Sequence, residues 1–509
     1  MADSAFGAAD CVSLAEVMSE GHVHTPFDPG SSAARMARRV GFWSGPLLFA
    51  ILLFLVHPRE MSREAHVVMA VTVWISIWWI TEAIPLAVTS LLPIVLFPLL
   101  KVLPIGDTTS SYGHPLVFLY IGGFLLAIAI EKTGLHNRIA INIIRRMGVK
   151  LKMIILGFML STGFLSMWIS NTATAVMMLP IGFAIISVAS GTLDEYTVRF
   201  RKALMLAIAY AASIGGVATL IGTPPNLVFV GVVKDMYHIE VSFLQWFLIG
   251  FPLAIILMLI CWWYLTRIGF PLHQATLHGG KAEMDARHSR LGKMSKAERH
   301  VSIVFVLMAV AWIIRSFLLQ KLIPGLDDTI IAMIGGVVLF ILPSGSPIKS
   351  GILTWEDAGK LPWGIILLFG GGMALAESFE TSGLATWIGA RMAGLSVLGH
   401  FAVILLVVAI VNFLTEFTSN LATVTMILPV LAPIAIAAGL PPLWLMAGAT
   451  MAASCGFMMP AGTPPNAIAF GSGYLRIMDM IRTGFVMNVI SIILITCIVY
   501  FLLGPMWGI

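Results

Sequence analysis

Apolar stretches separated by short polar segments run from residue 41 to the end of the chain. A helix of about 17 to 25 apolar residues is long enough to cross the hydrocarbon core of a bilayer. The pattern predicts about eleven such membrane helices. They fall at 41–56, 66–83, 85–101, 114–132, 203–233, 242–266, 301–320, 329–343, 362–380, 443–474 and 484–506. Residues 1–40 contain no such stretch and are expected to form a tail.

The composition supports this interpretation. Of the 509 residues, 59% are hydrophobic and 11% are charged, and the mean hydropathy is +0.95. So little polar surface predicts an all-α polytopic membrane protein. The net charge of +5 matches the Lys and Arg excess of cytoplasmic loops and does not imply nucleic acid. The four cysteines form no metal-binding or redox spacing, and no ATPase or hydrolase motif occurs, so we expect no enzyme and no cofactor.

Two apolar segments, 153–190 and 396–438, carry a polar motif at their centre. The first is flanked on both sides by basic residues, which are Arg145, Arg146, Lys150, Lys152, Arg199, Arg201 and Lys202. Because basic flanks stay in the cytoplasm, both ends are placed there, and so is the basic N-terminal tail. Two full membrane spans would also place both ends of the segment on the same side of the membrane. The tip at 169–176 has no charge, Gly or Pro, which favours a re-entrant hairpin buried in protein. The second segment is assigned to the outer face.

The chain is predicted to contain two halves. A basic stretch at 267–300, expected in the cytoplasm, separates a first half at 41–266 from a second at 301–509. Each half holds a hairpin (153–190 or 396–438) and a long helix that we expect to be broken (203–233 or 443–474). A shift of 249 residues lays Ser170 on Ser419 without a gap. Each repeat has five spans and a hairpin, and because five is odd the repeats are expected to be inverted.

The motifs predict where ions and substrate bind. Each hairpin is followed by GTPPN, at 222–226 and 462–466, and two consecutive prolines should unwind a helix and free its carbonyl groups. Together with hydroxyl and amide oxygens, these carbonyls form an all-oxygen cage suited to Na⁺. The predicted oxygen donors are Ser166, Ser170, Asn171 and Gly222 in one half, and Thr415, Thr418, Asn420 and Gly462 in the other. The helix N-termini at the breaks favour an anion alongside.

Packing is the simpler explanation for Ser, Thr and Gly in membrane helices. A single Ser-Asn motif would usually mean no more than that. The duplication at matched positions, each time with a GTPPN partner, favours a binding site. Glu416, just before the second tip, is either a cation or proton ligand or a residue paired inside the bundle.

The motifs FLSMWISNTATAVMMLP and ASCGFMMPAGTPPNAIAFGSG and the two GTPPN breaks resemble the divalent anion:sodium symporter family, over about residues 41–509. The resemblance implies a homodimer whose protomers each have a scaffold domain and a transport domain that moves like an elevator. It places one Na⁺ on Ser166, Ser170, Asn171 and Gly222, and another on Thr415, Thr418, Asn420 and Gly462. It places the substrate on Ser170, Asn171, Thr172, Thr223, Pro224, Ser419, Asn420, Leu421, Thr463 and Pro464.

The chain departs from the doubled Ser-Asn-Thr pattern at Leu421, which stands opposite Thr172. An apolar side chain there cannot donate a hydrogen bond to an anion and is suited to a methylene stem. We therefore expect Na⁺-coupled symport of C4 dicarboxylates such as succinate, malate or fumarate, in the plasma (inner) membrane. A dicarboxylate exchanger and a citrate or sulfate carrier of the same fold are the alternatives.

Overall fold

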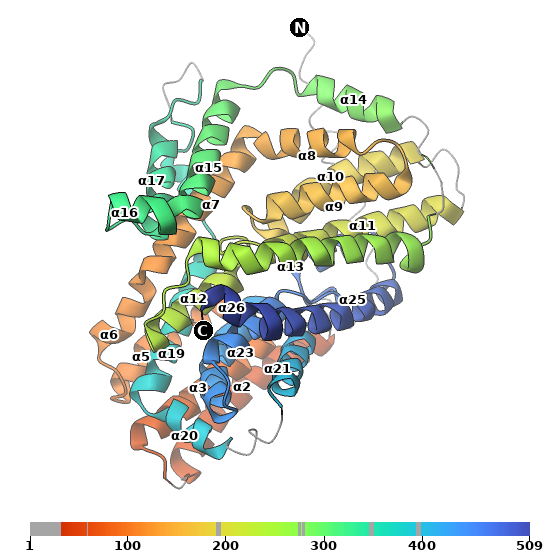
Figure 1. Cartoon of the computed structure of the whole chain (residues 1–509). Coiled ribbons are helices and arrows are strands. Elements are labelled where there is room, and N and C mark those ends of the chain that lie inside the picture. The colour runs from red at the N-terminus through yellow and green to blue at the C-terminus, as the bar shows by residue number, and fades with distance from the viewer. Residues whose placement is uncertain are drawn as a thin grey trace.

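The computed structural model describes residues 32–56, 58, 60–189, 195–272, 276, 280–345, 351–392 and 399–508. Within these ranges the chain forms helices, and extended structure is limited to two isolated bridges, Lys150 with Thr276 and Pro343 with Gly351. The expected all-α architecture is therefore confirmed. Figure 1 shows that most of the helices run in two directions, with α7, α15 and α17 steeply inclined to α9, α11, α13 and α25.

The helices of the first half are α2 (Ser32–Leu55), α3 (Arg63–Thr81), α4 (Leu86–Thr89), α5 (Leu92–Leu99), α6 (Ile105–Ser110), the 3₁₀ turn η1 (Ser111–Gly113), α7 (Pro115–Thr133), α8 (Leu135–Arg146), α9 (Leu151–Ser166), α10 (Asn171–Ala189), α11 (Glu195–Val217), α12 (Pro224–Tyr237) and α13 (Phe243–Tyr264), which continues as the π-helical segment η2 (Leu265–Gly269). The connecting helix α14 (Gly280–Arg290) follows.

The helices of the second half are α15 (Lys296–Ile314), extended by the π-helical segment η3 (Arg315–Leu319) and α16 (Gln320–Leu322), then α17 (Asp328–Ile341), α18 (Trp355–Ala358), α19 (Trp363–Thr381), α20 (Leu384–Arg391), α21 (His400–Leu414), α22 (Asn420–Ala437), α23 (Pro442–Ala453), α24 (Pro464–Gly471) and α25 (Ile477–Ile498), extended by the π-helical segment η5 (Val499–Leu503) and α26 (Gly504–Trp507).

Nine helices in the described ranges are long and apolar enough to cross a membrane. Shorter apolar helices lie at Leu86–Leu99, Leu151–Ser166, Asp328–Ile341, His400–Leu414 and Pro442–Ala453. Helix α2 begins at Ser32 and the first candidate span at Arg35, both inside the segment that the sequence assigns to the tail. The expected span 85–101 is divided into α4 and α5. The Ser90 hydroxyl donates to the Leu86 carbonyl at 2.8 Å, and Pro93, near the start of α5, has no N–H to continue α4.

Both long helices with GTPPN motifs are broken, as the prolines predict. α11 ends at Val217 and α12 begins at Pro224, while α23 ends at Ala453 and α24 begins at Pro464. Each of the two apolar segments with a central polar motif folds as a helical hairpin, α9–α10 and α21–α22, whose short turns lie at 167–170 and 415–419. The structure thus places each polar motif at a turn between two helices.

The connections after α7 and α19 are built alike. Gly134 and Gly383, which the 249-residue shift superposes, both have left-handed backbones, with φ of 76° and 79°. A left-handed residue ends one helix and turns the chain at once into a short second helix, and glycine adopts it without strain. The following helix, α8, was not anticipated. Its buried residues are Leu135, His136, Ala140, Ile141 and Ile144, whereas Arg145 and Arg146 at its end are exposed.

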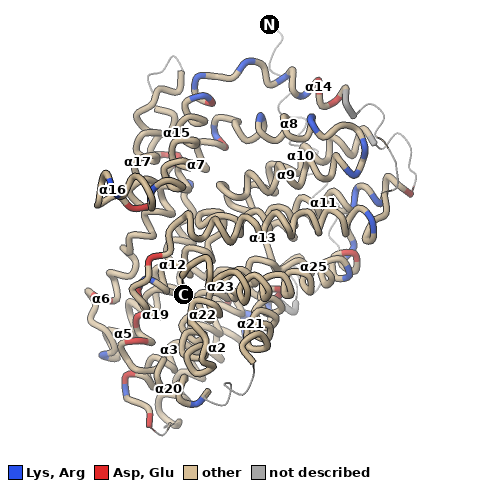
Figure 2. Tube along the Cα trace, in the orientation of Figure 1, with Lys and Arg blue, Asp and Glu red and all other residues tan. Residues whose placement is uncertain are grey.

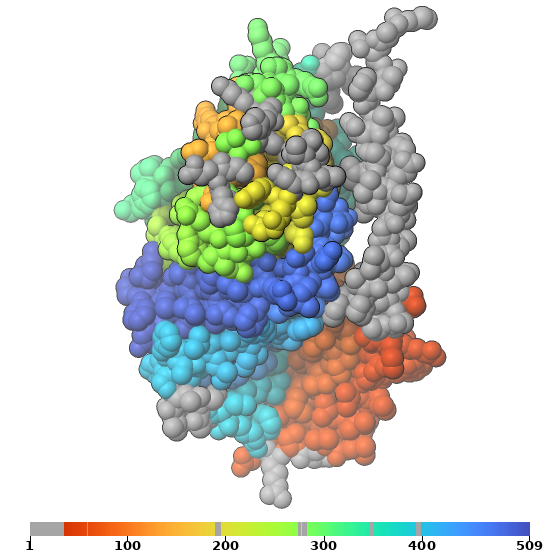
Figure 3. Space-filling model, turned by 90° about the vertical axis from the view of Figure 1, so that its right-hand side faces the viewer, coloured from red at the N-terminus to blue at the C-terminus, as the bar shows by residue number. Residues whose placement is uncertain are grey.

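The two halves interlock around the breaks. In each half the first hairpin arm packs on the helix before the break, α9 on α11 and α21 on α23. The helix after the break packs on the second hairpin arm of the other half, so that α12 contacts α22 and α24 contacts α10. In Figure 3 the blue band of α25 lies between the yellow-green residues of α13 above and light-blue residues of the second half below, and α25 contacts both α13 and α21. The residues of both polar motifs are thereby brought into one region.

Charged side chains gather at the ends of the helices. Figure 2 shows Lys and Arg toward the upper and right-hand ends of α8, α11 and α14, whereas Asp and Glu predominate near α12 and α19. One buried basic residue, Arg315, lies in the π-helical segment after α15, and its guanidinium is 2.8 Å from Asp328 and 3.1 Å from Glu240. Buried polar side chains also occur at the hairpin tips and the breaks, among them Ser166, Thr223, Thr415 and Thr463.

Candidate functional site

The tip of the first hairpin joins three oxygen atoms from α9, α10 and α11. The Ser166 hydroxyl oxygen lies 2.7 Å from the amide oxygen of Asn171 and 2.6 Å from the carbonyl oxygen of Ala212. Ser166 is fully buried. One hydroxyl carries one hydrogen and can donate it to only one of these acceptors at a time. The arrangement therefore has more acceptors than hydrogens, which suits a cation better than it suits the hydroxyl alone.

The tip of the second hairpin repeats this arrangement. The Thr415 hydroxyl oxygen lies 2.8 Å from the amide oxygen of Asn420 and 2.9 Å from the carbonyl oxygen of Ala453, and Thr415 is also fully buried. Ser166 and Asn171 correspond to Thr415 and Asn420 under the shift of 249 residues. The matched sequence positions therefore carry matched hydrogen bonds.

The unwound segments are held open by the asparagines of the two GTPPN motifs. The Asn226 amide donates to the carbonyls of Gly216 at 3.1 Å and Thr219 at 2.7 Å. The Asn466 amide donates to the carbonyls of Gly456 and Met459, both at 3.1 Å. Both side chains are fully buried. These asparagines fix the backbone of each break, a role that the sequence reasoning did not assign, although their identical place in both motifs could have indicated it.

The first break touches the first hairpin tip without space for a side chain. A Cβ added to Gly216 would lie 2.4 Å from the Asn171 amide oxygen, and one added to Gly222 would lie 2.5 Å from the Gly216 carbonyl oxygen. Only glycine permits these approaches. Ser166, Asn171 and Gly222, which the sequence groups as one ion site, thus lie together in one small region.

The remaining predicted ion ligands differ in how they are placed. Ser170 accepts a hydrogen bond from the Ala173 N–H at 3.3 Å and so caps α10. Thr418 donates to the Leu414 carbonyl at 3.0 Å and lies 2.5 Å from the Thr423 hydroxyl, inside its own hairpin. Gly462 lies beside Glu416, whose carboxylate oxygen is 2.8 Å from the position of an added Cβ. Direct coordination by Ser170 and Thr418 stays a prediction.

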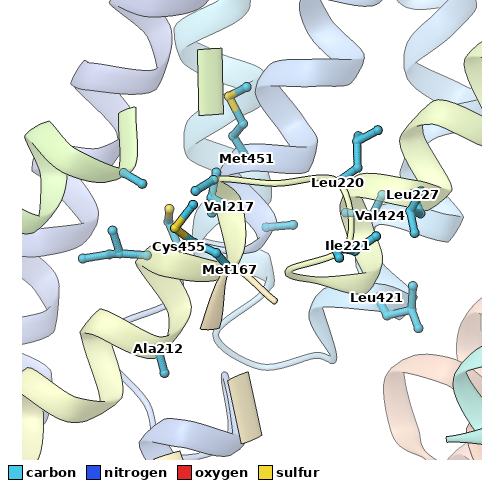
Figure 4. Close-up of a cluster of buried hydrophobic side chains, with 14 of the residues drawn as sticks. Met167, Ala212, Val217, Leu220, Ile221, Leu227, Leu421, Val424, Met451 and Cys455 are labelled. Carbon is cyan, nitrogen blue, oxygen red and sulfur yellow. The ribbon is translucent and has the colours of Figure 1, made fainter. Parts of the chain in front are cut away.

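The predicted substrate residues differ in exposure. Thr172 and Pro464 are exposed, while Ser170, Asn171, Ser419, Asn420 and Pro224 are half-buried. Thr223, Thr463 and Leu421 are buried. Figure 4 shows Leu421 and Val424 of α22 on the side of α12 and of the break that carries Leu220 and Ile221. Leu421 therefore packs against the first break instead of sharing the exposure of Thr172.

Glu416 has a set of partners that the sequence left open. Its carboxylate, 1% exposed, accepts hydrogen bonds from the backbone N–H groups of Phe457, Met458 and Met459 and from the Asn488 amide, at 2.7 to 2.9 Å. All four donors lie on the segment before the second GTPPN motif or on α25. Glu416 is thus bound inside the bundle, to uncharged groups.

The fold and the two oxygen-rich tips define a class of protein, the polytopic membrane transporters with broken helices. Two solved structures share the fold. The YdaH transporter of Alcanivorax borkumensis has a TM-score of 0.58 at 14% identity, covering 92% of this chain and 98% of that one. MtrF of Neisseria gonorrhoeae, from a class of antimetabolite efflux pumps, has a TM-score of 0.56 at 13% identity, covering 96% and 98%.

Residues 44–508 match the model of the sodium:sulfate symporter transmembrane region, and the chain belongs to this family. It is 45% identical over 478 residues to the sodium-dependent dicarboxylate transporter SdcS of Staphylococcus saprophyticus, with 92% of each chain covered. The SdcS protein of a bovine Staphylococcus aureus strain is also 45% identical, with the same coverage. The resemblance drawn from the motifs is confirmed, and this protein is an integral membrane transporter and not an enzyme.

Proposed function

We propose that this protein is a Na⁺-coupled symporter of C4 dicarboxylates. The observation that carries the proposal is the pair of matched oxygen clusters at Ser166 and Thr415, each with two acceptor oxygens and one hydroxyl hydrogen. Oxygen-only sites without a full set of donors suit a hard monovalent cation. The similarity to proteins named sodium-dependent dicarboxylate transporters supports the assignment of ion and substrate class.

In this proposal each Na⁺ binds between a hairpin tip and a break. The first ion takes oxygens of Ser166, Ser170, Asn171 and Gly222, and the second takes oxygens of Thr415, Thr418, Asn420 and Gly462. The dicarboxylate binds at the helix N-termini that begin at Asn171, Pro224, Asn420 and Pro464, where the positive end of each helix dipole favours an anion. Ion binding orders both tips before the anion docks, which couples the two.

The hairpins are proposed to be re-entrant, entering from opposite sides in inverted repeats. The first arms, α9 and α21, have 16 and 15 residues. At about 1.5 Å per residue they reach roughly 22 to 24 Å, less than the roughly 30 Å of the hydrocarbon core. The second arms, α10 and α22, are long enough to cross. The short first arms therefore support tips that end at membrane depth.

We also propose a larger organisation on the family resemblance. The hairpins and broken helices, with α13 and α25, form a transport domain that moves like an elevator against a scaffold built from the remaining spans. The protein is a homodimer in the plasma membrane. Its N-terminal tail is proposed to lie in the cytoplasm, because Lys and Arg residues next to membrane spans are retained there.

Leu421 is proposed to favour a dicarboxylate over sulfate. Its matched position in the first half is Thr172, whose exposed hydroxyl is available to one carboxylate. Leu421 is buried beside the first break and brings no donor to the second half of the site, so an anion that needs donors on all sides is disfavoured. Competition by malate, fumarate, citrate and sulfate against labelled succinate tests this, with sulfate expected to compete least. Stronger competition by sulfate than by malate would contradict it.

The proposed function predicts that succinate uptake into proteoliposomes rises steeply when an inward Na⁺ gradient is imposed. The same gradient of K⁺ or choline should give only background uptake, because the oxygen clusters must hold Na⁺ before the anion docks. The measurement is initial uptake of labelled succinate by the purified full chain, with empty liposomes as control. Uptake that ignores Na⁺ but requires dicarboxylate inside the liposomes would instead establish an exchanger.

A further inference from the structure

Glu416 differs from the other buried acidic side chains of the described residues. Three of the four have a basic partner, namely Glu298 with Arg138 at 2.9 Å, Asp328 with Arg315 at 2.8 Å and Asp357 with Lys132 at 2.6 Å. Among the described residues, no Lys, Arg or His forms an ion pair with Glu416. A buried charge without a counter-charge is costly in a membrane protein and is a mark of function.

The partners of Glu416 are all hydrogen-bond donors. Oε1 accepts from the N–H groups of Phe457 at 2.7 Å and Met458 at 2.9 Å and from Asn488 Nδ2 at 2.7 Å. Oε2 accepts from the Met459 N–H at 2.8 Å. Oε1 is thus saturated, whereas Oε2 keeps acceptor capacity. These bonds fix the carboxylate in place and stabilise its charge, but none of them supplies a positive charge.

Oε2 lies next to the backbone of Gly462, which belongs to the second proposed ion site. Oε2 lies 2.8 Å from where a Cβ of Gly462 would be, and Gly462 is the residue whose carbonyl is a proposed ligand. Glu416 also directly follows Thr415, whose hydroxyl belongs to the second oxygen cluster. The negative charge of Glu416, which has no counter-charge, therefore lies beside the second proposed ion site. It is next to Gly462 in space and next to Thr415 in the chain.

In the first half, the corresponding break is held by hydrogen bonds to an uncharged side chain. Met167 stands where Glu416 stands in the second half, under the shift of 249 residues. There the break is tied by the Thr219 hydroxyl, which donates to the Met167 carbonyl at 2.5 Å and accepts from the Gly222 N–H at 3.0 Å. A neutral hydroxyl is therefore sufficient to hold a break, so structure alone does not require the carboxylate.

We propose that Na⁺ at the second site is the counter-ion of Glu416, so that this site binds Na⁺ more tightly than the first and fills first. The inference rests on the proposed Na⁺ coupling and adds an order of binding to it. Glu416 acts as a positioning residue through the Gly462 backbone and through its charge. Two charges separated by several ångströms attract far more strongly in the protein interior than in water.

The test is the Na⁺ dependence of thermal stability of the purified full chain in detergent, without substrate and with choline keeping ionic strength constant. Bound Na⁺ stabilises the folded state by an amount that grows with the logarithm of the ratio of the Na⁺ concentration to the dissociation constant. Glu416→Gln keeps the shape and removes the charge, and it should raise the Na⁺ concentration needed for a given rise in unfolding temperature by about tenfold or more. Glu416→Asp keeps the charge and shortens the side chain, and it should stay within about threefold of the unmodified protein.

Asn488→Ala is the matched structural control. It removes one donor to the carboxylate and leaves the charge, so it should lower the unfolding temperature in the absence of Na⁺. The Na⁺ concentration needed for a given rise in unfolding temperature should be unchanged or lower. If Glu416 had only a structural role, all three variants would lower the unfolding temperature and change its Na⁺ dependence in the same direction. The inference is overturned if Glu416→Gln leaves the Na⁺ dependence unchanged, or if Glu416→Asp weakens it as much as removing the charge is expected to.

The same experiment separates this inference from the proposed function. If Na⁺ stabilises the unmodified protein and Glu416→Gln does not change that dependence, only the role of Glu416 is refuted. If Na⁺, K⁺ and choline give the unmodified protein the same unfolding temperature, Na⁺ binding itself fails, and both proposals fall.

Discussion

Asn171→Ala and Asn420→Ala are each expected to abolish Na⁺-driven succinate uptake while the chain stays folded. Each change removes the amide oxygen that lies 2.7 or 2.8 Å from the Ser166 or Thr415 hydroxyl. A ligand lost from a charged, buried site costs more than an ordinary hydrogen bond, so the loss of uptake should be on the order of a hundredfold or more. The measurement is initial uptake into proteoliposomes at a fixed Na⁺ gradient.

Asn142→Ala is the matched control for both variants, because Asn142 lies half-buried on α8, outside the two motifs. It should transport like the unmodified protein. Size-exclusion profiles of all three variants should match that of the unmodified protein, since the asparagines at the tips are half-buried. Substantial uptake by either tip variant would refute the assignment of that tip as an ion site.

Gly216→Ala should inactivate the transporter although it adds a single methyl group. The new Cβ would lie 2.4 Å from the Asn171 amide oxygen, too close for any carbon–oxygen contact, and the asparagine must move. Because Asn171 is a proposed ligand of the first ion, we expect Na⁺ affinity to fall by about tenfold or more. The Na⁺ dependence of thermal stability and of uptake measures this.

Gly471→Ala is the corresponding control, because a Cβ at the end of α24 meets nothing within 4 Å. It should keep both uptake and Na⁺ dependence. If Gly216→Ala transported as well as Gly471→Ala, the contact between the first break and the first hairpin tip would have no part in transport.

The sequence predicted the parts of the site whose cause is local. The prolines of both GTPPN motifs break their helices whatever surrounds them, and a polar motif at the centre of an apolar segment marks a turn. The duplication then matched Ser166 with Thr415 and Asn171 with Asn420. In the structure these matched residues form matched hydrogen bonds.

The rest depends on contacts between distant segments. Glu416 bonds to residues 457–459 and to Asn488, which are close only after α21, α23 and α25 have packed. The amide bonds of Asn226 and Asn466 follow from the shape of the unwound loops, which sequence does not specify. The early start of α2 at Ser32 was missed because polar and basic residues there follow no apolar pattern. Helix α8 was not predicted because it is amphipathic, and the prediction was based on continuous apolar stretches.

The central claim is that the two matched tips bind Na⁺ that crosses the membrane together with the dicarboxylate. Uptake of radiolabelled Na⁺ into proteoliposomes, measured with and without external succinate, tests it most directly. The account predicts that succinate stimulates Na⁺ entry in the unmodified protein and that Asn171→Ala and Asn420→Ala abolish this stimulation. Succinate accumulation without any accompanying entry of labelled Na⁺ would contradict it.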